Sequence, residues 1–178
     1  MHICALAAIM LTGVTAMSVA AEVTPVTHQQ AHDWLLHVIP LPKQVTIERK
    51  ATVSLASVAV NVALGSSDLV RGEAMALLSE NEEDAQFTIL VGVLDAGKLG
   101  GRAIEGTGRL DGLRNSEQAY LIRSLDDRTL VVTGLSPAGV FYGLKTLRQL
   151  IEPTLSGYCA PATVDIPLGS ILDWPDLA

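Results

Sequence analysis

Aromatic residues are scarce in this chain. They make up 4% of its 178 residues, and Trp34 and Trp174 are the only tryptophans. Sugar-binding surfaces of the lectin type depend on exposed rings that offer an apolar face beside a polar tip. The composition therefore argues against a binding module built from such rings.

Runs of basic residues are also lacking. The formal net charge is −7, and nucleic-acid binding needs a concentrated Lys and Arg footprint for its phosphate contacts. The sequence predicts no nucleic-acid partner. Five arginines stand apart among acidic neighbours, namely Arg102, Arg109, Arg114, Arg123 and Arg128.

Cysteine is almost absent. Cys4 lies in an apolar N-terminal segment, and Cys159 is the only other cysteine. Once that segment is removed, no disulfide can form within the domain. We interpret Cys159 as a small buried apolar residue, with a bridge to another polypeptide segment or a reactive thiol as the alternatives.

Residues 1–21 lack charged side chains apart from His2. Residues 3–14 are typical of the apolar region of a signal peptide, although no Lys or Arg precedes them. Ser18-Val19-Ala20 and Val19-Ala20-Ala21 both fit the small-x-small rule of signal peptidase. The sequence predicts a signal peptide over residues 1–21, cleaved near Ala20 or Ala21, and export to the periplasm or the extracellular space.

A transmembrane anchor is the competing interpretation of this leader, because the apolar run approaches the length of a short spanning helix. Thr12, Gly13, Thr15 and Ser18 lower its hydrophobicity. We therefore expect no stable membrane span.

Apolar residues make up 49% of the chain, enough for the core of one ordinary domain. Strand-like alternation covers residues 44–48 and 57–63, and a near-continuous apolar run over 87–94 is typical of a well-buried central strand. Further strands are expected at residues 119–124, 129–133 and 163–166. Residues 125–128 have the composition of the hairpin turn between two of them.

Capping residues and spacing indicate two helices. Ser67-Asp68 forms an N-cap pair and predicts a helix to about Ser79. Ser136-Pro137 places an N-cap before a proline at the first helical position and predicts a helix to about Glu152. The apolar face of this second helix is expected to contain Val140, Phe141, Leu144, Leu147, Leu150 and Ile151.

The remaining segments show neither the helical nor the strand-like spacing of apolar residues. Residues 22–38 are a polar lead-in with at most a short helical turn, residues 96–115 a glycine-rich surface loop, and residues 167–178 an extended tail. The order β, β, α, β, β, β, α, β favours an α+β fold. Its simplest form has two helices packed on one face of a mostly antiparallel sheet.

Histidines near the N-terminus offer the strongest metal-like spacing. His28 and His32 stand four residues apart, which would place both on one face of a helix, and Asp33 and His37 are close by. The chain has no His-Glu-x-x-His pattern. We interpret the segment as a solvated N-terminal arm and keep metal ligation as the alternative.

Two further patterns lack the context that their chemistry needs. Asp173 and Asp176 form a carboxylate pair around Pro175, for which a linker role is favoured over acid–base catalysis. Gly106-Thr107-Gly108 begins like a dinucleotide loop, but Gly112 comes one position too late for the third glycine. The residues alone assign no catalytic, substrate-binding or metal site and no cofactor.

Several stretches resemble one family when taken together. They are Ile39-Pro40-Leu41-Pro42-Lys43, a pair of strands over residues 117–122 and 130–134, residues 134–150, and residues 166–167 with 171–176. The third matches a Gly-x-Phe-Tyr-Gly-Leu-x-Thr-Leu-x-Gln-Leu helix almost residue for residue. Together they resemble the N-terminal domain of glycoside hydrolase family 20.

The helix in this resemblance has a packing role. Gly139 and Gly143 lie four apart on one face, where they allow a strand or a barrel helix to approach closely. Because a helical glycine costs about 1 kcal/mol relative to alanine, close packing explains the pair better than chance. Phe141 and Leu144 are expected to supply the buried side. The family-signature residues are Gly139, Phe141, Tyr142, Gly143, Leu144, Leu147, Gln149 and Leu150.

The resemblance implies a zincin-like α+β domain without the zinc motif over residues 39–167. Residues 168–178 would then be a linker, in which Asp173, Trp174 and Pro175 lead to a (β/α)₈ barrel. In such enzymes the barrel carries an Asp–Glu pair that acts with the 2-acetamido group of the substrate.

The chain is too short to include such a barrel, which needs roughly 250 residues. We therefore expect a non-catalytic front part of a β-N-acetylhexosaminidase-like enzyme, with the barrel as partner and N-acetylhexosamine-bearing glycans as its substrates. An apolar barrel-facing surface should then make the isolated chain aggregate. The alternatives are a stand-alone carbohydrate-binding module, or the front domain of an O-GlcNAc-hydrolase or α-glucuronidase type of enzyme.

Overall fold

The computed structural model describes residues 21–77, 85–154 and 163–175. The predicted signal peptide (but for Ala21), both cysteines, the predicted helix end at Ser79 and Asp176 lie outside these residues. Among the described residues, no helix has the length and apolar character needed to cross a membrane.

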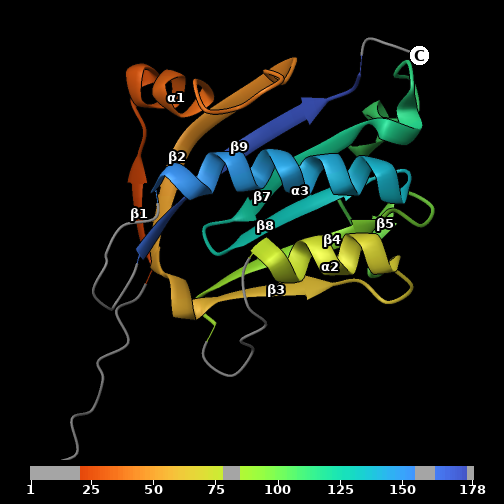
Figure 1. Cartoon of the computed structure of the whole chain (residues 1–178), viewed down its shortest axis with the longest axis horizontal. Coiled ribbons are helices and arrows are strands. Elements are labelled where there is room, and N and C mark those ends of the chain that lie inside the picture. Colours follow the sequence, from red (N-terminus) through yellow and green to blue (C-terminus); the bar gives the residue numbers. More distant parts are fainter. Residues whose placement is uncertain (1–20, 78–84, 155–162, 176–178) are drawn as a thin grey trace, which may run out of the picture.

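A seven-stranded sheet forms the centre of the domain, in the order β1-β2-β9-β7-β8-β4-β3 (Figure 1). Four of its six pairings are antiparallel and two, β8 with β4 and β4 with β3, are parallel. The expected mostly antiparallel sheet is thus confirmed. The strands are β1 (Glu22–Pro25), β2 (Gln44–Ser54), β3 (Val58–Val62), β4 (Phe87–Val93), β7 (Tyr120–Asp126), β8 (Thr129–Gly134) and β9 (Thr163–Asp173).

The parallel part of the sheet follows from its connections. Helix α2 (Asp68–Leu77) joins β3 to β4, and such a crossover is what parallel neighbours require. β4 is buried as expected, although it lies one strand in from the β3 edge rather than at the centre.

Two helices cover one face of the sheet, α2 and α3 (Pro137–Ile151), which lie side by side (Figure 1). Both begin at the predicted caps. The Ser67 hydroxyl accepts from the Val70 amide at 3.4 Å, and the Ser136 hydroxyl from the Ala138 amide at 3.1 Å. Their apolar sides and the sheet enclose the main hydrophobic cluster.

The helical glycines of α3 let the segment before β7 and side chains of β7 and β8 approach the helix. A Cβ at Gly139 would lie 2.2 Å from the carbonyl oxygen of Ala119, and one at Gly143 would lie 2.8 Å from a methyl group of Val132. The predicted close packing is confirmed, and the neighbours are strand residues and the segment that leads into β7.

Residues 94–119 cover the opposite face, which corrects the interpretation of residues 96–115 as a surface loop. They form a short hairpin, β5 (Lys98–Leu99) with β6 (Arg102–Ala103), and 3₁₀ turns. Leu99, Ile104 and Leu110 are buried against the sheet in a second hydrophobic cluster. The sequence did not reveal this role because these leucines and isoleucines have no regular spacing.

The N-terminal segment is also more ordered than expected. It contains β1, paired with β2, and helix α1 (His28–Leu35), which begins with a capping box between Thr27 and Gln30. Trp34 is buried, and its indole Nε1 donates to the Leu150 carbonyl at 2.8 Å. The interpretation as a solvated arm is therefore wrong, because a tryptophan anchors the segment to α3.

The last strand is longer than expected. β9 continues through Pro167 to Asp173 and pairs with both β2 and β7. The expected extended tail from residue 167 is thus wrong up to residue 173. The hydrogen bonds of two neighbouring strands hold this part of the chain in the middle of the sheet.

Candidate functional site

A pocket of about 440 Å³ opens where four parts of the chain meet. Residues 39–43, which we call the proline segment, form one wall with Ile39 and Pro40. Helix α3 contributes Tyr142 and Lys145, β7 contributes Tyr120, and the segment after β9 contributes Pro175. The stretches that resemble the family thus lie far apart in the sequence but converge on this pocket.

The floor of the pocket is a buried hydrogen-bonded chain. The Tyr120 hydroxyl lies 2.6 Å from the Thr146 hydroxyl and donates to Oδ2 of Asp173 at 3.2 Å. Burial, reinforced by the negative charge of Asp173, raises the pKa of Tyr120 well above its ordinary value of 10.0. The phenol therefore stays protonated and remains a donor to the carboxylate.

Asp173 also contacts the proline segment. Its Oδ1 accepts from the backbone amide of Lys43 at 3.2 Å, and the Lys43 ammonium lies 3.9 Å from the same oxygen. That ammonium donates to the Trp174 carbonyl and stands 5.0 Å from the centre of the Trp174 ring. Asp173 is only 8% exposed, so these partners satisfy a carboxylate that water hardly reaches.

Gln149 holds the other end of the proline segment. Its side-chain oxygen accepts from the Ile39 amide at 2.6 Å, and its Nε2 donates to the Ile39 carbonyl at 3.3 Å. This signature glutamine therefore acts as a bridge between α3 and the proline segment, a role that its place in a helical pattern does not reveal.

The rim of the pocket is apolar and exposed. Ile39 is 79% exposed and Tyr142 45%, and Leu41 in the proline segment and Leu36 at the end of α1 are also exposed. Such a group of large apolar side chains on one part of the surface is typical of a contact with another polypeptide.

The other signature residues fall into two groups. Gly139, Gly143, Leu144, Leu147 and Leu150 are buried as expected. Phe141 corrects the prediction, because it is only half-buried and packs edge-on against the ring of Tyr142, with the ring centres 5.7 Å apart. The ammonium of Lys145, one turn further along α3, lies 5.1 Å from the centre of the same ring.

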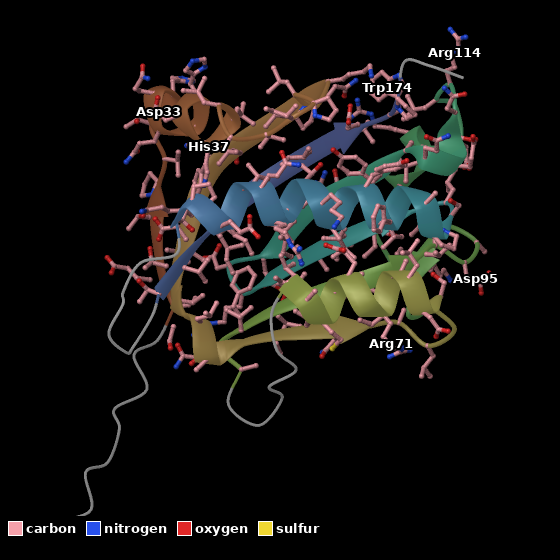
Figure 2. The ribbon with its side chains drawn as sticks, viewed as in Figure 1. Asp33, His37, Arg71, Asp95, Arg114 and Trp174 are labelled. Carbon is pink, nitrogen blue, oxygen red and sulfur yellow. The ribbon has the colours of Figure 1, made fainter. Side chains whose placement is uncertain are left out.

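The predicted histidine pair lies elsewhere. His28 and His32 are exposed on α1, where the described residues contain no group of three side chains suited to a metal ion. A smaller pocket of about 270 Å³ beside α1 includes Asp33 and His37. Figure 2 shows these two residues near α1, away from Trp174.

The main pocket is suited to packing rather than to chemistry. Its floor groups, Tyr120, Thr146 and Asp173, already bond to one another and to Lys43. A catalytic centre needs a nucleophile or base that can reach a substrate, and these groups instead hold the protein together.

Sequence reasoning missed Tyr120, Thr146 and Lys43 as members of this cluster. Each comes from a different element, and no spacing along the chain links them. Asp173 was placed in a linker and is instead the last residue of β9. In the dinucleotide-like stretch, Gly106 leads into a single 3₁₀ turn, Thr107–Arg109, and Thr107 is buried.

A comparison with protein families finds one match. The model of glycosyl hydrolase family 20, domain 2, matches residues 35–174. This range contains the proline segment, α3 and the end of β9. Among curated protein sequences, none matches the chain.

Solved structures share the fold. A mutant β-hexosaminidase of Streptomyces plicatus in complex with GlcNAc is 20% identical, with a TM-score of 0.52 over 89% of this chain and 28% of that one. The β-N-acetylhexosaminidase of Streptomyces coelicolor A3(2) is 22% identical, with a TM-score of 0.51 over the same shares. CpGH84B is 20% identical, with a TM-score of 0.52 over 78% of this chain and 22% of its own. The chain thus spans only about a quarter of each solved protein.

Proposed function

The chain belongs to the family of domain 2 of glycosyl hydrolase family 20, and on that premise we propose that it is the non-catalytic front domain of an exported β-N-acetylhexosaminidase-like enzyme. Its role is to pack against a catalytic (β/α)₈ barrel and support it. That barrel, in turn, removes terminal N-acetylhexosamine from glycans.

The family match over residues 35–174 carries this proposal. The pocket agrees with it, because the polar groups on the floor are paired and the rim offers Ile39 and Tyr142 to a partner. The exposed apolar residues in and next to the proline segment, together with the exposed ring of Tyr142 on α3, form the docking surface. We define it by Leu36, Ile39, Leu41 and Tyr142.

The gene gives the most direct test. The genomic DNA should be sequenced beyond the Ala178 codon. As the resemblance to family 20 implies, we expect the reading frame to continue into Arg-Gly and a barrel that carries an Asp–Glu pair. A verified stop codon at that position would contradict the proposal that this domain and a barrel form one polypeptide.

The isolated chain should lack hydrolase activity. We expect no release of chromophore from a chromogenic N-acetylglucosaminide, because the described residues bring no reactive acid–base pair to an open site. Hydrolysis that co-purifies with the chain, and that is absent from a mock purification, would overturn the non-catalytic role.

The docking surface can be tested by self-association. Without its barrel, the chain should associate in sedimentation experiments as concentration rises, because an apolar patch is exposed to water. Tyr142→Lys and Ile39→Lys should each reduce the association. Leu64→Lys is the matched control, because Leu64 is 100% exposed outside the docking surface. An equal effect of all three changes would argue against a specific surface.

A stand-alone carbohydrate-binding module is the second candidate, and the half-exposed ring of Tyr142 beside the pocket is the observation that favours it. The paired floor groups count against it, because a sugar needs free donors and acceptors. Binding of the chain to a glycan array would support this candidate.

A front domain of a related glycosidase is a third candidate. The fold is also found in CpGH84B, a protein whose name does not place it in family 20. The residues encoded after Ala178 would separate the two, since the Arg-Gly continuation is what the family 20 resemblance implies.

The proposal that the protein is exported rests on the N-terminal leader alone. The apolar run over residues 3–14 and the small residues before Ala21 support cleavage near Ala20 or Ala21. N-terminal sequencing of the protein from its native host should give Ala21 or Glu22 as the first residue. A retained Met1 would point to the anchor instead.

A further inference from the structure

The backbone ladder between β2 and β9 stops just before the pocket. Its outermost pair is Gln44 with Leu172, so the next residues, Lys43 and Asp173, lie beyond the regular hydrogen bonds of these two strands. At this point a side chain takes over. The amide of Lys43 donates to the Asp173 carboxylate at 3.2 Å instead of to a backbone carbonyl of β9.

We propose that Asp173 is a positioning residue that clasps the proline segment to the end of β9 and so fixes the direction in which the chain leaves the sheet. The clasp consists of Asp173, Lys43 and Trp174. Its meaning rests on the proposed function, because the direction of the chain after Pro175 matters only if a further domain follows.

Two elements hold the Asp173 carboxylate in place. Tyr120 on β7 donates to Oδ2, and Thr146 on α3 bonds to the Tyr120 hydroxyl. One oxygen of Asp173 is therefore bound on the side of the sheet and helix, and the other faces the proline segment. This arrangement leaves the carboxylate one orientation, and that orientation determines where the Lys43 amide sits.

Lys43 connects the Asp173 carboxylate to the residue that follows β9. Its ammonium lies 3.9 Å from Asp173 Oδ1 and donates to the Trp174 carbonyl, and it stands 5.0 Å from the centre of the Trp174 ring. A second contact secures the next residue, because the side-chain Nδ2 of Asn115 donates to the Pro175 carbonyl at 3.3 Å. Trp174 and Pro175 are therefore fixed on both sides, although neither is part of a strand.

The two tryptophans allow a direct test. The full chain, labelled with 5-fluorotryptophan, should give two ¹⁹F resonances, one from Trp174 in the clasp and one from Trp34, which is bound to Leu150 outside the clasp. In Lys43→Met we expect the Trp174 resonance to narrow and move toward the position of the free amino acid, while the Trp34 resonance stays. Lys98→Met, which changes an exposed lysine outside the clasp, is the matched control and should leave both resonances in place.

Asp173→Ala tests the positioning role itself. It should move the Trp174 resonance in the same way and make the Lys43 amide exchange with solvent on the order of tenfold faster, because its charged acceptor is gone. The amide of Val132 in β8 serves as the reference for global stability. Should this variant fail to fold, Asp173→Asn replaces it, since it removes the charge that faces Lys43 but keeps the side-chain volume.

An unmoved Trp174 resonance in both the Lys43 and the Asp173 variants would overturn the clasp. Movement in Lys43→Met alone would show that lysine holds the ring by itself, and would overturn the role of Asp173. None of these signals involves a barrel. A negative result therefore leaves the proposed function untouched, and a missing barrel in the gene would leave the clasp standing.

Discussion

The two faces of the sheet are covered by different kinds of structure. Regular helices cover one face, and α3 places Val140, Leu144, Leu147 and Leu150 against the strands. Residues 94–119 cover the other face with a small hairpin and turns. Both faces bury leucines completely, so the difference lies in the backbone that carries the side chains.

This difference determines which parts of a core can be predicted. A helix repeats its apolar residues every three or four positions, and that period is visible in a sequence. In residues 94–119 the buried positions Leu99, Ile104 and Leu110 are fixed by turns at glycines with positive φ, such as Gly106. We therefore expect the helix face to be rigidly packed and the loop face to adapt more easily.

The largest effect is expected at the contact between α3 and the start of β7. In Gly139→Ala the new methyl group would lie 2.2 Å from the Ala119 carbonyl oxygen. That oxygen belongs to the backbone and a Cβ has no rotamer, so neither can turn away. The free energy of unfolding should fall by about 3 kcal/mol or more, as measured by urea denaturation.

Gly72→Ala is the control for this change. Gly72 lies in α2, and nothing stands within 4 Å of a Cβ there. This substitution should raise the free energy of unfolding by up to about 1 kcal/mol through helix propensity alone. A similar loss of stability in both variants would show that Gly139 is not needed for close packing.

The two faces can be compared directly by truncating one buried leucine on each. Leu144 on α3 and Leu110 on the loop face are both fully buried. Leu144→Ala should lower the free energy of unfolding by about 3 kcal/mol and Leu110→Ala by about 2 kcal/mol, because an irregular backbone collapses more readily into the space left behind. Equal losses in denaturation experiments would mean that the loop face is packed as rigidly as the helix face.

The raised pKa of Tyr120 predicts that the protein loses stability in alkali. Its pKa in the folded protein is raised above 10.0, mainly by burial. Its stabilising contribution is therefore complete below pH 10 and declines above that pH, where the unfolded chain releases the phenol proton first. The free energy of unfolding should fall by up to about 1.4 kcal/mol per pH unit from this residue.

Tyr120→Phe provides the reference for that slope. Urea denaturation of both proteins at pH 8, 10 and 11 isolates the contribution of Tyr120, because other groups titrate in both. Parallel pH curves would contradict the raised pKa of Tyr120 and the burial that causes it.

The smallest effect is expected where the two coverings of the sheet meet. The Ser136 hydroxyl caps α3 and also donates to the Glu117 carbonyl in the segment that leads off the loop face. Ser136→Ala should lower the free energy of unfolding by about 1 kcal/mol. Thermal unfolding can measure it, and Ser136→Gly should recover most of the loss if the cap dominates.

The sequence supported the prediction of the regular elements and of the family. The caps at Ser67 and Ser136 and the close packing of Gly139 were correct, since each depends on neighbours in the chain or on a helical repeat. The strand end at residue 166 was placed too early, because a proline at 167 suggested a break that pairing with β2 and β7 overrides.

The pocket was the least predictable part. Tyr120, Thr146, Lys43 and Asp173 come together only because β7, α3, the proline segment and β9 meet there. Neither composition nor spacing contains this information. The resemblance did name the stretches that form the pocket, but it could not show that they touch.

The position of β9 has a consequence for how the protein is made. It is the last of the described strands to be synthesised, yet it lies between β2 and β7 and joins the two parts of the sheet. During translation, β1 with β2 forms one pair of strands and β3, β4, β7 and β8 form the other part, with an unpaired edge on each. Such edges invite incorrect pairing. The ribosome must therefore release residues 163–173 before either part is protected, and this last step is non-local and correspondingly slow.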